Sequence, residues 1–257
     1  MSAARVAALG GAPAEAVPDA AAAERARSER SQIAELLSRR GVEVVDGSPD
    51  ELPPLLADRG YAVTTLTLPG LEPDHPARGA LAVGDNPTAM ADRRDLLDRM
   101  QEALANPAVD GVLASPDIMD DLLLLGALDG KLLFGSMNRG GLAGYVNEMD
   151  DRFTGHTAAA LEALGANGGK MLTRICLGDP ATVATLESTA KVIDSLAERR
   201  LVAMVEPFIS VWDNGRIRND LSTDAVIKSI AIASGLGSTS AYTWMKLPVV
   251  QDMERVM

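Results

Sequence analysis

The sequence has few residues of the kinds that build disulfides and metal sites. Its single cysteine, Cys176, excludes an internal disulfide and a cysteine-rich metal centre. Its two histidines, His75 and His156, lie far apart in the sequence and show no zinc-ligand spacing. We therefore expect a protein without a bound metal and without another cofactor.

Basic residues and long apolar segments are also scarce. The chain has 24 Lys and Arg against 36 Asp and Glu, a formal net charge of −12. This balance argues against a nucleic-acid partner, although a small anionic substrate needs only a few local cations. Apolar runs such as residues 122–125 are far shorter than the ~20 residues that span a bilayer, and the N-terminus has no compact apolar core like that of a signal peptide. We expect a cytoplasmic protein with no membrane segment.

Aromatic residues make up only 3% of the chain, whereas hydrophobic residues make up 47%. A core of Ala, Leu, Val, Ile and Met suits buried parallel strands that are covered by helices. The 257 residues are the usual size of one α/β barrel, and they could also hold two small domains.

The chain divides into an N-terminal extension over residues 1–60 and a region of alternating strands and helices over residues 61–257. The extension begins rich in Ala, Gly and Pro, and residues 21–40 have the spacing of an amphipathic helix. Apolar runs predict strands at 61–68, 111–114, 131–137, 171–177, 201–209 and 242–247. Helical spacing predicts helices at 90–105, 117–128, 156–164, 180–199 and 224–234, and the Arg216 and Arg218 pair is expected in a solvated turn around Asn214-Gly215.

This alternation indicates βα units and a parallel sheet, which fits either a closed barrel or an open doubly wound sheet. No Gly-rich phosphate fingerprint opens the first helix, so the dinucleotide-binding open sheet lacks its signal. We therefore predict a (β/α)8 TIM barrel. Only six strands are counted before Met257, so the last two βα units of that barrel are expected to be missing.

Charged side chains interrupt or follow several of the predicted strands, although a charge inside a barrel is costly unless it is paired or used. Because functional groups of barrels gather at the carboxyl ends of strands, we expect these side chains to converge. They are Asp74 and His75 beyond the first strand, Lys170 and Arg174 with shared parity on the fourth, Glu206 on the fifth and Lys246 on the sixth.

This set supports amine catalysis. A lysine loses affinity for its proton when it is buried in apolar surroundings and lies near another cation. Its amine can then condense with a ketone or aldehyde. Lys246 would be the nucleophile and Lys170 the neighbouring cation, while Glu206 and Asp74 would transfer protons. Each of these residues could instead be half of a structural ion pair, or a lysine whose stem reaches along apolar surface to water.

The order of these residues, with Gly-Gly-Lys-Met-Leu at 168–172, Glu-Pro at 206–207 and Lys-Leu-Pro at 246–248, resembles the class I aldolase superfamily. That superfamily includes tagatose-bisphosphate, fructose-bisphosphate and deoxyribose-phosphate aldolases. The chain is most similar to an actinobacterial aldolase-like branch, through residues 74–81, 135–142, 204–208 and 240–250.

The resemblance covers the chain from about residue 72 onward. It implies a metal-independent lyase that acts on a phosphorylated ketose or keto-sugar acid through a lysine Schiff base. The side chains that it implies for substrate binding are Arg174, His75, Asn138 and Arg139.

Two features depart from the family pattern. The segment before Asp74, Leu-Pro-Gly-Leu-Glu-Pro, is not a continuous apolar strand end. The loops after strands seven and eight, which generally hold the substrate phosphate in such barrels, are not found in the predicted elements. An open six-stranded barrel would also expose two sheet edges. Either the sequence is a truncated product, or residues 21–70 supply further strands, or another chain closes the gap, and we expect a homo-oligomer.

Two other functions remain open from the sequence. One is a sugar-phosphate isomerase or epimerase in which Glu206 is the base and Lys246 stabilises charge without forming a covalent bond. The other is a truncated, non-catalytic barrel.

Overall fold

The computed structural model describes residues 74–106, 109–146 and 148–256. Among them, five strands run parallel: β1 (Gly111–Ala114), β2 (Leu132–Ser136), β3 (Gly168–Ile175), β4 (Val202–Asp213) and β6 (Thr243–Met245). The sixth, β5 (Arg216–Asn219), is antiparallel to β4. The helix α4 (Arg93–Ala105) precedes β1. The helices between strands are α5 (Pro116–Leu124), α6 (Ala158–Leu164), α7 (Ala181–Ala197) and α8 (Thr223–Ala233), while the short helices η1 (Pro76–Arg78) and α9 (Met253–Val256) lie near the ends of the described part.

Three of the helices, α4, α6 and α8, begin where a polar side chain caps them. The carboxylate of Asp92 accepts the N–H of Asp95 before α4, and the hydroxyl of Thr157 accepts the N–H of Ala160 before α6. These bonds satisfy N–H groups that have no partner inside a helix. Gly165 ends α6 in the left-handed conformation, at φ 73°, which glycine adopts without a steric penalty.

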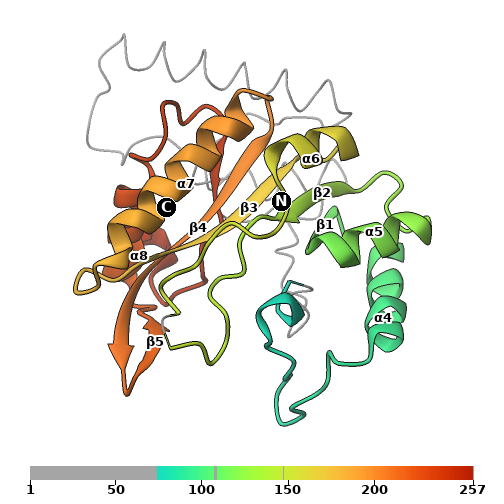
Figure 1. Cartoon of the computed structure of the whole chain (residues 1–257), viewed down its shortest axis with the longest axis horizontal. Coiled ribbons are helices and arrows are strands. Elements are labelled where there is room, and N and C mark those ends of the chain that lie inside the picture. The colour runs from blue at the N-terminus through green and yellow to red at the C-terminus, as the bar shows by residue number, and fades with distance from the viewer. Residues whose placement is uncertain (1–73, 107–108, 147, 257) are drawn as a thin grey trace.

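The predicted (β/α)8 barrel is wrong, because the described residues form an open, curled, mixed sheet (Figure 1). The strand order is β1-β2-β3-β4-β5, and β6 pairs with β4. Within the described residues, β1 pairs only with β2 and β6 only with β4, so no strand joins these two edges. In addition, β4 extends beyond its parallel partners and forms an antiparallel hairpin with β5.

The hairpin explains part of the difference from the predicted elements. Asn214 and Gly215 have φ values of 50° and 75°, as a tight two-residue hairpin turn requires. Arg216 and Arg218 therefore lie on a strand rather than in the turn, although both side chains are exposed as expected. The predicted strand at 61–68 and the predicted extension at 1–60 lie outside the described residues.

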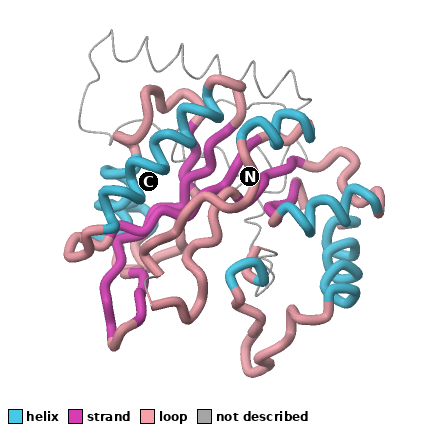
Figure 2. Tube along the Cα trace, in the orientation of Figure 1, coloured by secondary structure: helices cyan, strands magenta, loops and turns pink. Residues whose placement is uncertain are grey.

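The main core lies between the sheet and its helices. Odd-numbered strand residues such as Met171, Val205 and Met245 pack with Ile193 and Leu196 of α7. Figure 2 shows α6 and α7 lying across the band of strands. Because side chains alternate along a strand, the even-numbered residues of β2, β3, β4 and β6 project from the opposite face of the sheet.

Part of that opposite face is apolar. Phe134, Val202 and Trp244 form a buried cluster near the amino ends of their strands, with ring centroids of Phe134 and Trp244 5.8 Å apart. Met204 extends this cluster. Further along the same face lie the polar side chains of Ser136, Lys170 and Glu206, which belong to the site described below. The polar side chains of the site therefore lie next to an apolar cluster on the same face of the sheet.

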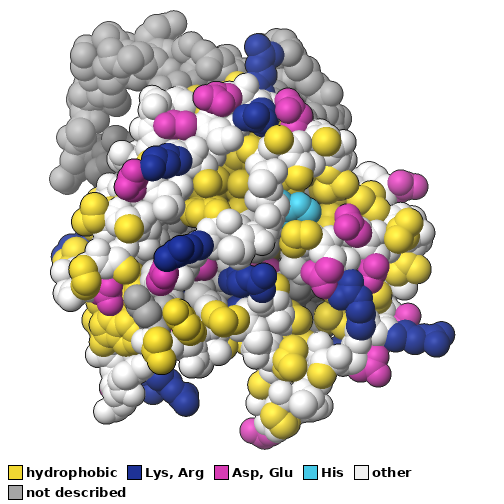
Figure 3. Space-filling view, in the orientation of Figure 1, with side chains coloured by type: hydrophobic (Ala, Val, Ile, Leu, Met, Phe, Trp, Pro, Cys, Tyr) yellow, Lys and Arg dark blue, Asp and Glu magenta, His cyan; other side chains and the backbone are white. Residues whose placement is uncertain are grey.

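On the molecular face drawn in Figure 3, Lys and Arg side chains are interspersed with Asp and Glu side chains. Among the described residues, no helix has the length and apolar character needed to cross a membrane.

Candidate active site

Four neighbouring chain segments bring polar side chains to one face of the sheet. Ser136 of β2 is in register with Lys170 of β3. Glu206 of β4 is in register with the second residue after Lys170. Lys246 follows β6 directly, and its N–H donates to the carbonyl of Val205 at 2.8 Å. The parallel pairing of β2, β3, β4 and β6 thus places these side chains side by side.

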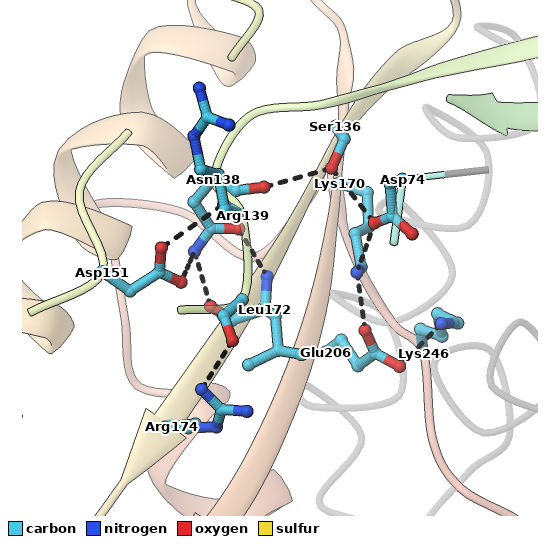
Figure 4. A network of polar contacts seen from close by, with 11 residues as sticks. Asp74, Ser136, Asn138, Arg139, Asp151, Lys170, Leu172, Arg174, Glu206 and Lys246 are labelled. Atoms are coloured by element: carbon cyan, nitrogen blue, oxygen red, sulfur yellow. Dashed lines mark hydrogen bonds and ion pairs between the residues drawn. The ribbon is translucent and has the colours of Figure 1, made fainter. Parts of the chain in front are cut away.

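The side chains form a line of alternating charge (Figure 4). Nζ of Lys246 lies 2.6 Å from Oε1 of Glu206, and Nζ of Lys170 lies 2.8 Å from Oε2 of the same carboxylate. Among the described residues, Oε2 accepts no hydrogen bond, so its contact with Lys170 is an ion pair without hydrogen-bond geometry. Lys170 also donates to Oδ2 of Asp74 at 3.2 Å, and the hydroxyl of Ser136 donates to the same oxygen at 3.2 Å.

These ions differ in how much of the side chain is exposed. The exposed fractions are 4% for Lys170, 9% for Asp74 and 11% for Glu206, against 24% for Lys246. Burying an ion costs several kcal/mol unless a partner compensates, and here two ammonium groups and two carboxylates alternate. Lys246 is therefore the most accessible amine of the four-residue charge line.

Asn138 fixes the loop that follows β2 against β3. Its amide oxygen accepts the N–H of Leu172 at 3.0 Å, and its Nδ2 donates to the carbonyl of Leu172 at 2.7 Å. Nδ2 also donates to Oδ2 of Asp151 at 3.0 Å. Burial raises the pKa of Asp151 above its ordinary value, although backbone N–H groups of Gly141 and Arg139 partly oppose that shift.

Arg174 lies on the same face of β3 as Lys170, four residues further along. Its side chain is buried, and its Nη1 donates to the carbonyl of Gly140 at 2.5 Å. Its Nε donates to Oδ1 of Asn219 at 3.4 Å. Burial, and then repulsion from Arg78, lowers the pKa of this guanidinium below its ordinary value.

The structure therefore brings together four of the eight residues expected in the site, namely Lys246, Glu206, Lys170 and Asp74. Asn138, in the loop after β2, and Arg174, on β3, border that group (Figure 4). Arg139 is exposed and donates to Thr154 at 3.0 Å and to the carbonyl of Ala77, so its guanidinium holds η1 to the loop. His75 is the half-buried residue before η1.

Sequence reasoning missed Ser136 and Asp151. Ser136 ends the apolar run Leu-Leu-Phe-Gly-Ser, and a polar residue that interrupts or ends such a run was the signal used for the lysines. Asp151 lies in a long loop where no spacing relates it to a strand, so the sequence carried no comparable signal.

The donor set does not resemble a metal centre. Within the described residues, no group of three or more His, Cys, Asp or Glu side chains is placed to hold a metal ion. Both carboxylates of the charge line, Glu206 and Asp74, already contact an ammonium group. The accessible chemistry is that of an amine beside a carboxylate.

The fold and the site define a class of α/β protein in which an amine that directly follows one parallel strand, β6, contacts a carboxylate on the neighbouring strand, β4. The chain belongs to the Cgl0159-like family, whose model matches residues 70–257. It is also similar to the crystal structure of Cgl0159 from Corynebacterium glutamicum, with 51% sequence identity and a TM-score of 0.70. That match covers 88% of this chain and 76% of the other. A comparison with curated proteins finds no match.

Proposed function

We propose that the chain is a class I aldolase that cleaves or forms a carbon–carbon bond through a Schiff base on Lys246. The observation that carries this proposal is the 2.6 Å contact between Nζ of Lys246 and Oε1 of Glu206, in a site where a second ammonium lies 2.8 Å from Oε2. An amine next to a proton-transferring carboxylate is the arrangement that imine formation requires.

The proposed reaction begins with these two groups. Lys246 transfers a proton to Glu206, and the neutral amine then attacks the carbonyl carbon of the substrate. Glu206 returns the proton to the carbinolamine hydroxyl, which leaves as water and yields an iminium ion. The iminium accepts the electron pair of the breaking carbon–carbon bond while the Glu206 carboxylate takes the proton from the hydroxyl on the departing carbon, which leaves as an aldehyde, the first product. The resulting enamine takes this proton on carbon, and water hydrolyses the iminium to release the second product and the free lysine.

Lys170 and Asp74 support this cycle without forming a covalent bond. Lys170 contacts Oε2 of Glu206 and so orients the carboxylate toward Lys246. Asp74 in turn accepts a hydrogen bond from the ammonium of Lys170, and the hydroxyl of Ser136 holds the Asp74 carboxylate in place. A fixed positive charge in a buried site also stabilises negative charge that develops on a substrate oxygen.

The substrate that we propose is a phosphorylated ketose or keto-sugar acid, bound without a metal ion. We further propose that the protein acts in the cytoplasm as a homo-oligomer and has no nucleic-acid partner. The strongly acidic composition supports the last of these statements, because the chain has no surplus of basic residues.

Borohydride reduction tests the Schiff base directly. The protein is incubated with dihydroxyacetone phosphate, or separately with a small aldehyde, and reduced, and its intact mass is then measured. We expect one adduct per chain in the wild type and none in Lys246→Arg, which keeps the positive charge. Lys228→Arg on α8 is the matched control and should form the adduct as the wild type does.

A folded wild-type protein that forms no adduct with either carbonyl compound would contradict the proposal. Exchange of substrate hydrogen with deuterated solvent, without an adduct, would then indicate the isomerase or epimerase chemistry with Glu206 as base. Neither exchange nor adduct would indicate a non-catalytic protein.

A further inference from the structure

Arg174 is a buried cation without a carboxylate partner among the described residues. Its side chain is 7% exposed, and the acceptors that it contacts are neutral: the carbonyl of Gly140 and the amide oxygen of Asn219. Buried arginines usually pair with an anion, because an uncompensated buried charge is costly. The surroundings of Arg174 therefore suit a negatively charged group that comes from elsewhere.

The guanidinium of Arg78 approaches the same turn, at Gly140 and Gly141, that the guanidinium of Arg174 approaches. A Cβ placed on Gly140 would lie 3.4 Å from Nη1 of Arg78, and a Cβ placed on Gly141 would lie 2.6 Å from Nη1 of Arg174. The two arginines thus approach consecutive glycines. Arg78 is half-buried, and its buried Nε has no hydrogen-bond partner within the described part of the chain. The position of Arg78 is fixed because its carbonyl accepts the N–H of Ala143 at 2.8 Å.

The turn is built for this close approach. Gly140 and Gly141 have φ values of 71° and 85°, a conformation that side-chain-bearing residues rarely adopt. Any Cβ at Gly141 would also meet the Arg174 guanidinium. The two glycines therefore leave room for both cations beside the loop.

The carboxylates near the pair lie beyond ion-pair distance within the described residues. Glu148, Asp151 and Glu206 act on Arg174 electrostatically, but none of them forms an ion pair with Arg174 or Arg78 within 4.0 Å in the described residues. Asp151 is already engaged by Asn138 and by backbone N–H groups of the same loop. Two adjacent guanidinium groups can offer parallel N–H donors to the oxygens of a tetrahedral dianion.

We propose that Arg78 and Arg174 form the subsite that binds the phosphate group of the substrate. Arg174 is two residues beyond Leu172, which is in register with Glu206. Two residues of a strand span about 7 Å, so the subsite lies further along the same sheet face than the Glu206–Lys246 pair. Assigning the bound phosphate to the aldolase substrate rests on the proposed function, whereas binding of the anion itself does not.

Titration with inorganic phosphate tests the subsite without any turnover. Binding is measured by calorimetry at pH 7.5 and constant ionic strength, and acetate is titrated as the monoanionic comparison. We expect phosphate to bind the wild type at least about tenfold more tightly than acetate, because two cations match a dianion better than a monoanion. Lack of phosphate binding in the folded wild type would overturn the proposal.

Variants locate the binding. Arg78→Gln is the informative change, because Arg78 is half-buried and its replacement leaves the Arg174 hydrogen bonds intact. We expect it to weaken phosphate binding about tenfold or more, while its melting temperature without phosphate stays close to that of the wild type. Arg94→Gln, at an exposed position of α4, is the matched control and should bind phosphate as the wild type does. Equal affinity in Arg78→Gln and the wild type would refute the assignment.

One further variant separates this proposal from the proposed function. Lys246→Arg should bind inorganic phosphate with wild-type affinity although it forms no borohydride adduct. An adduct on the wild type with no phosphate binding would leave the aldolase standing and remove the subsite. Phosphate binding that depends on Arg78, without any adduct on the wild type, would support the subsite and contradict the aldolase.

Discussion

Glu206 contacts both lysines of the charge line, through one carboxylate oxygen each. A neutral amide at this position could still accept a hydrogen bond, but it could not take the proton of Lys246. We expect Glu206→Gln to slow formation of the reducible adduct by roughly 10²–10⁴-fold, the usual contribution of a general acid–base group. Quenched time courses with borohydride measure this rate, and Glu102→Gln on the exposed side of α4 is the control. An unchanged rate in Glu206→Gln would exclude proton transfer by this carboxylate.

Lys170 compensates two buried carboxylates, so its charge is expected to matter for stability as well as for orientation. Lys170→Met should lower the free energy of unfolding by about 3–5 kcal/mol, because Asp74 and Glu206 would keep their charges with fewer partners. Urea unfolding measures the change. Lys191→Met removes the exposed ion pair with Glu187 and should shift the unfolding midpoint little. Similar small shifts in both variants would show that the buried pairing contributes little.

His156 provides a prediction about pH. Its half-buried ring lies against β2, where a Cβ on Gly135 would be 2.5 Å from the ring Cδ2, and burial lowers its pKa below the ordinary 6.5. The folded state then binds a proton less readily than the unfolded state, so stability is lost as the pH falls below about 6.5. In urea unfolding, the free energy of unfolding should fall more between pH 7.5 and pH 5 in the wild type than in His156→Gln. A difference that stays constant with pH would contradict this.

At the level of elements, glycines in the strands allow close contact between neighbours. A Cβ on Gly168 of β3 would overlap the backbone carbonyl of Val202 and lie 2.8 Å from a ring carbon of Phe134. We expect Gly168→Ala to destabilise the protein by about 1–3 kcal/mol through overpacking, as measured by urea unfolding. Gly178→Ala is the control, since no atom lies within 4 Å of its added Cβ. Equal stability of the two variants would mean that β3 and β4 can separate without cost.

Local sequence patterns predicted most of the described elements. The expected strand at 111–114 coincides with β1, and the shared parity of Lys170 and Arg174 placed both on one face of β3. The hairpin between β4 and β5 was missed although its turn signal, Asn214-Gly215, was present. The segment after the turn, Arg-Ile-Arg-Asn, has only one apolar residue and so gave little sign of a strand. The pairings of Glu206 and Asp74 with particular lysines could not be predicted, because they depend on the register between strands far apart in the sequence.

For the whole molecule, the sequence could not show whether the sheet closes. Apolar periodicity counts βα units, but closure depends on hydrogen bonds between the first and last strands, which no local pattern encodes. The described residues form an open curled sheet, so the prediction of a (β/α)8 barrel was wrong. The convergence of charged residues still followed, because neighbouring parallel strands place side chains of matching parity on one face in open sheets as well as in barrels.

The central claim is that Lys246, the most exposed lysine of the charge line, reacts with the substrate carbonyl. The chain has only five lysines, Lys131, Lys170, Lys191, Lys228 and Lys246, so digestion of the borohydride-reduced protein can assign an adduct to one of them. Tandem mass spectrometry of the peptides is the most direct measurement. We predict the modification on Lys246 alone. A modification on Lys170, or one spread over Lys131, Lys191 and Lys228, would contradict the assignment of Lys246 as the nucleophile.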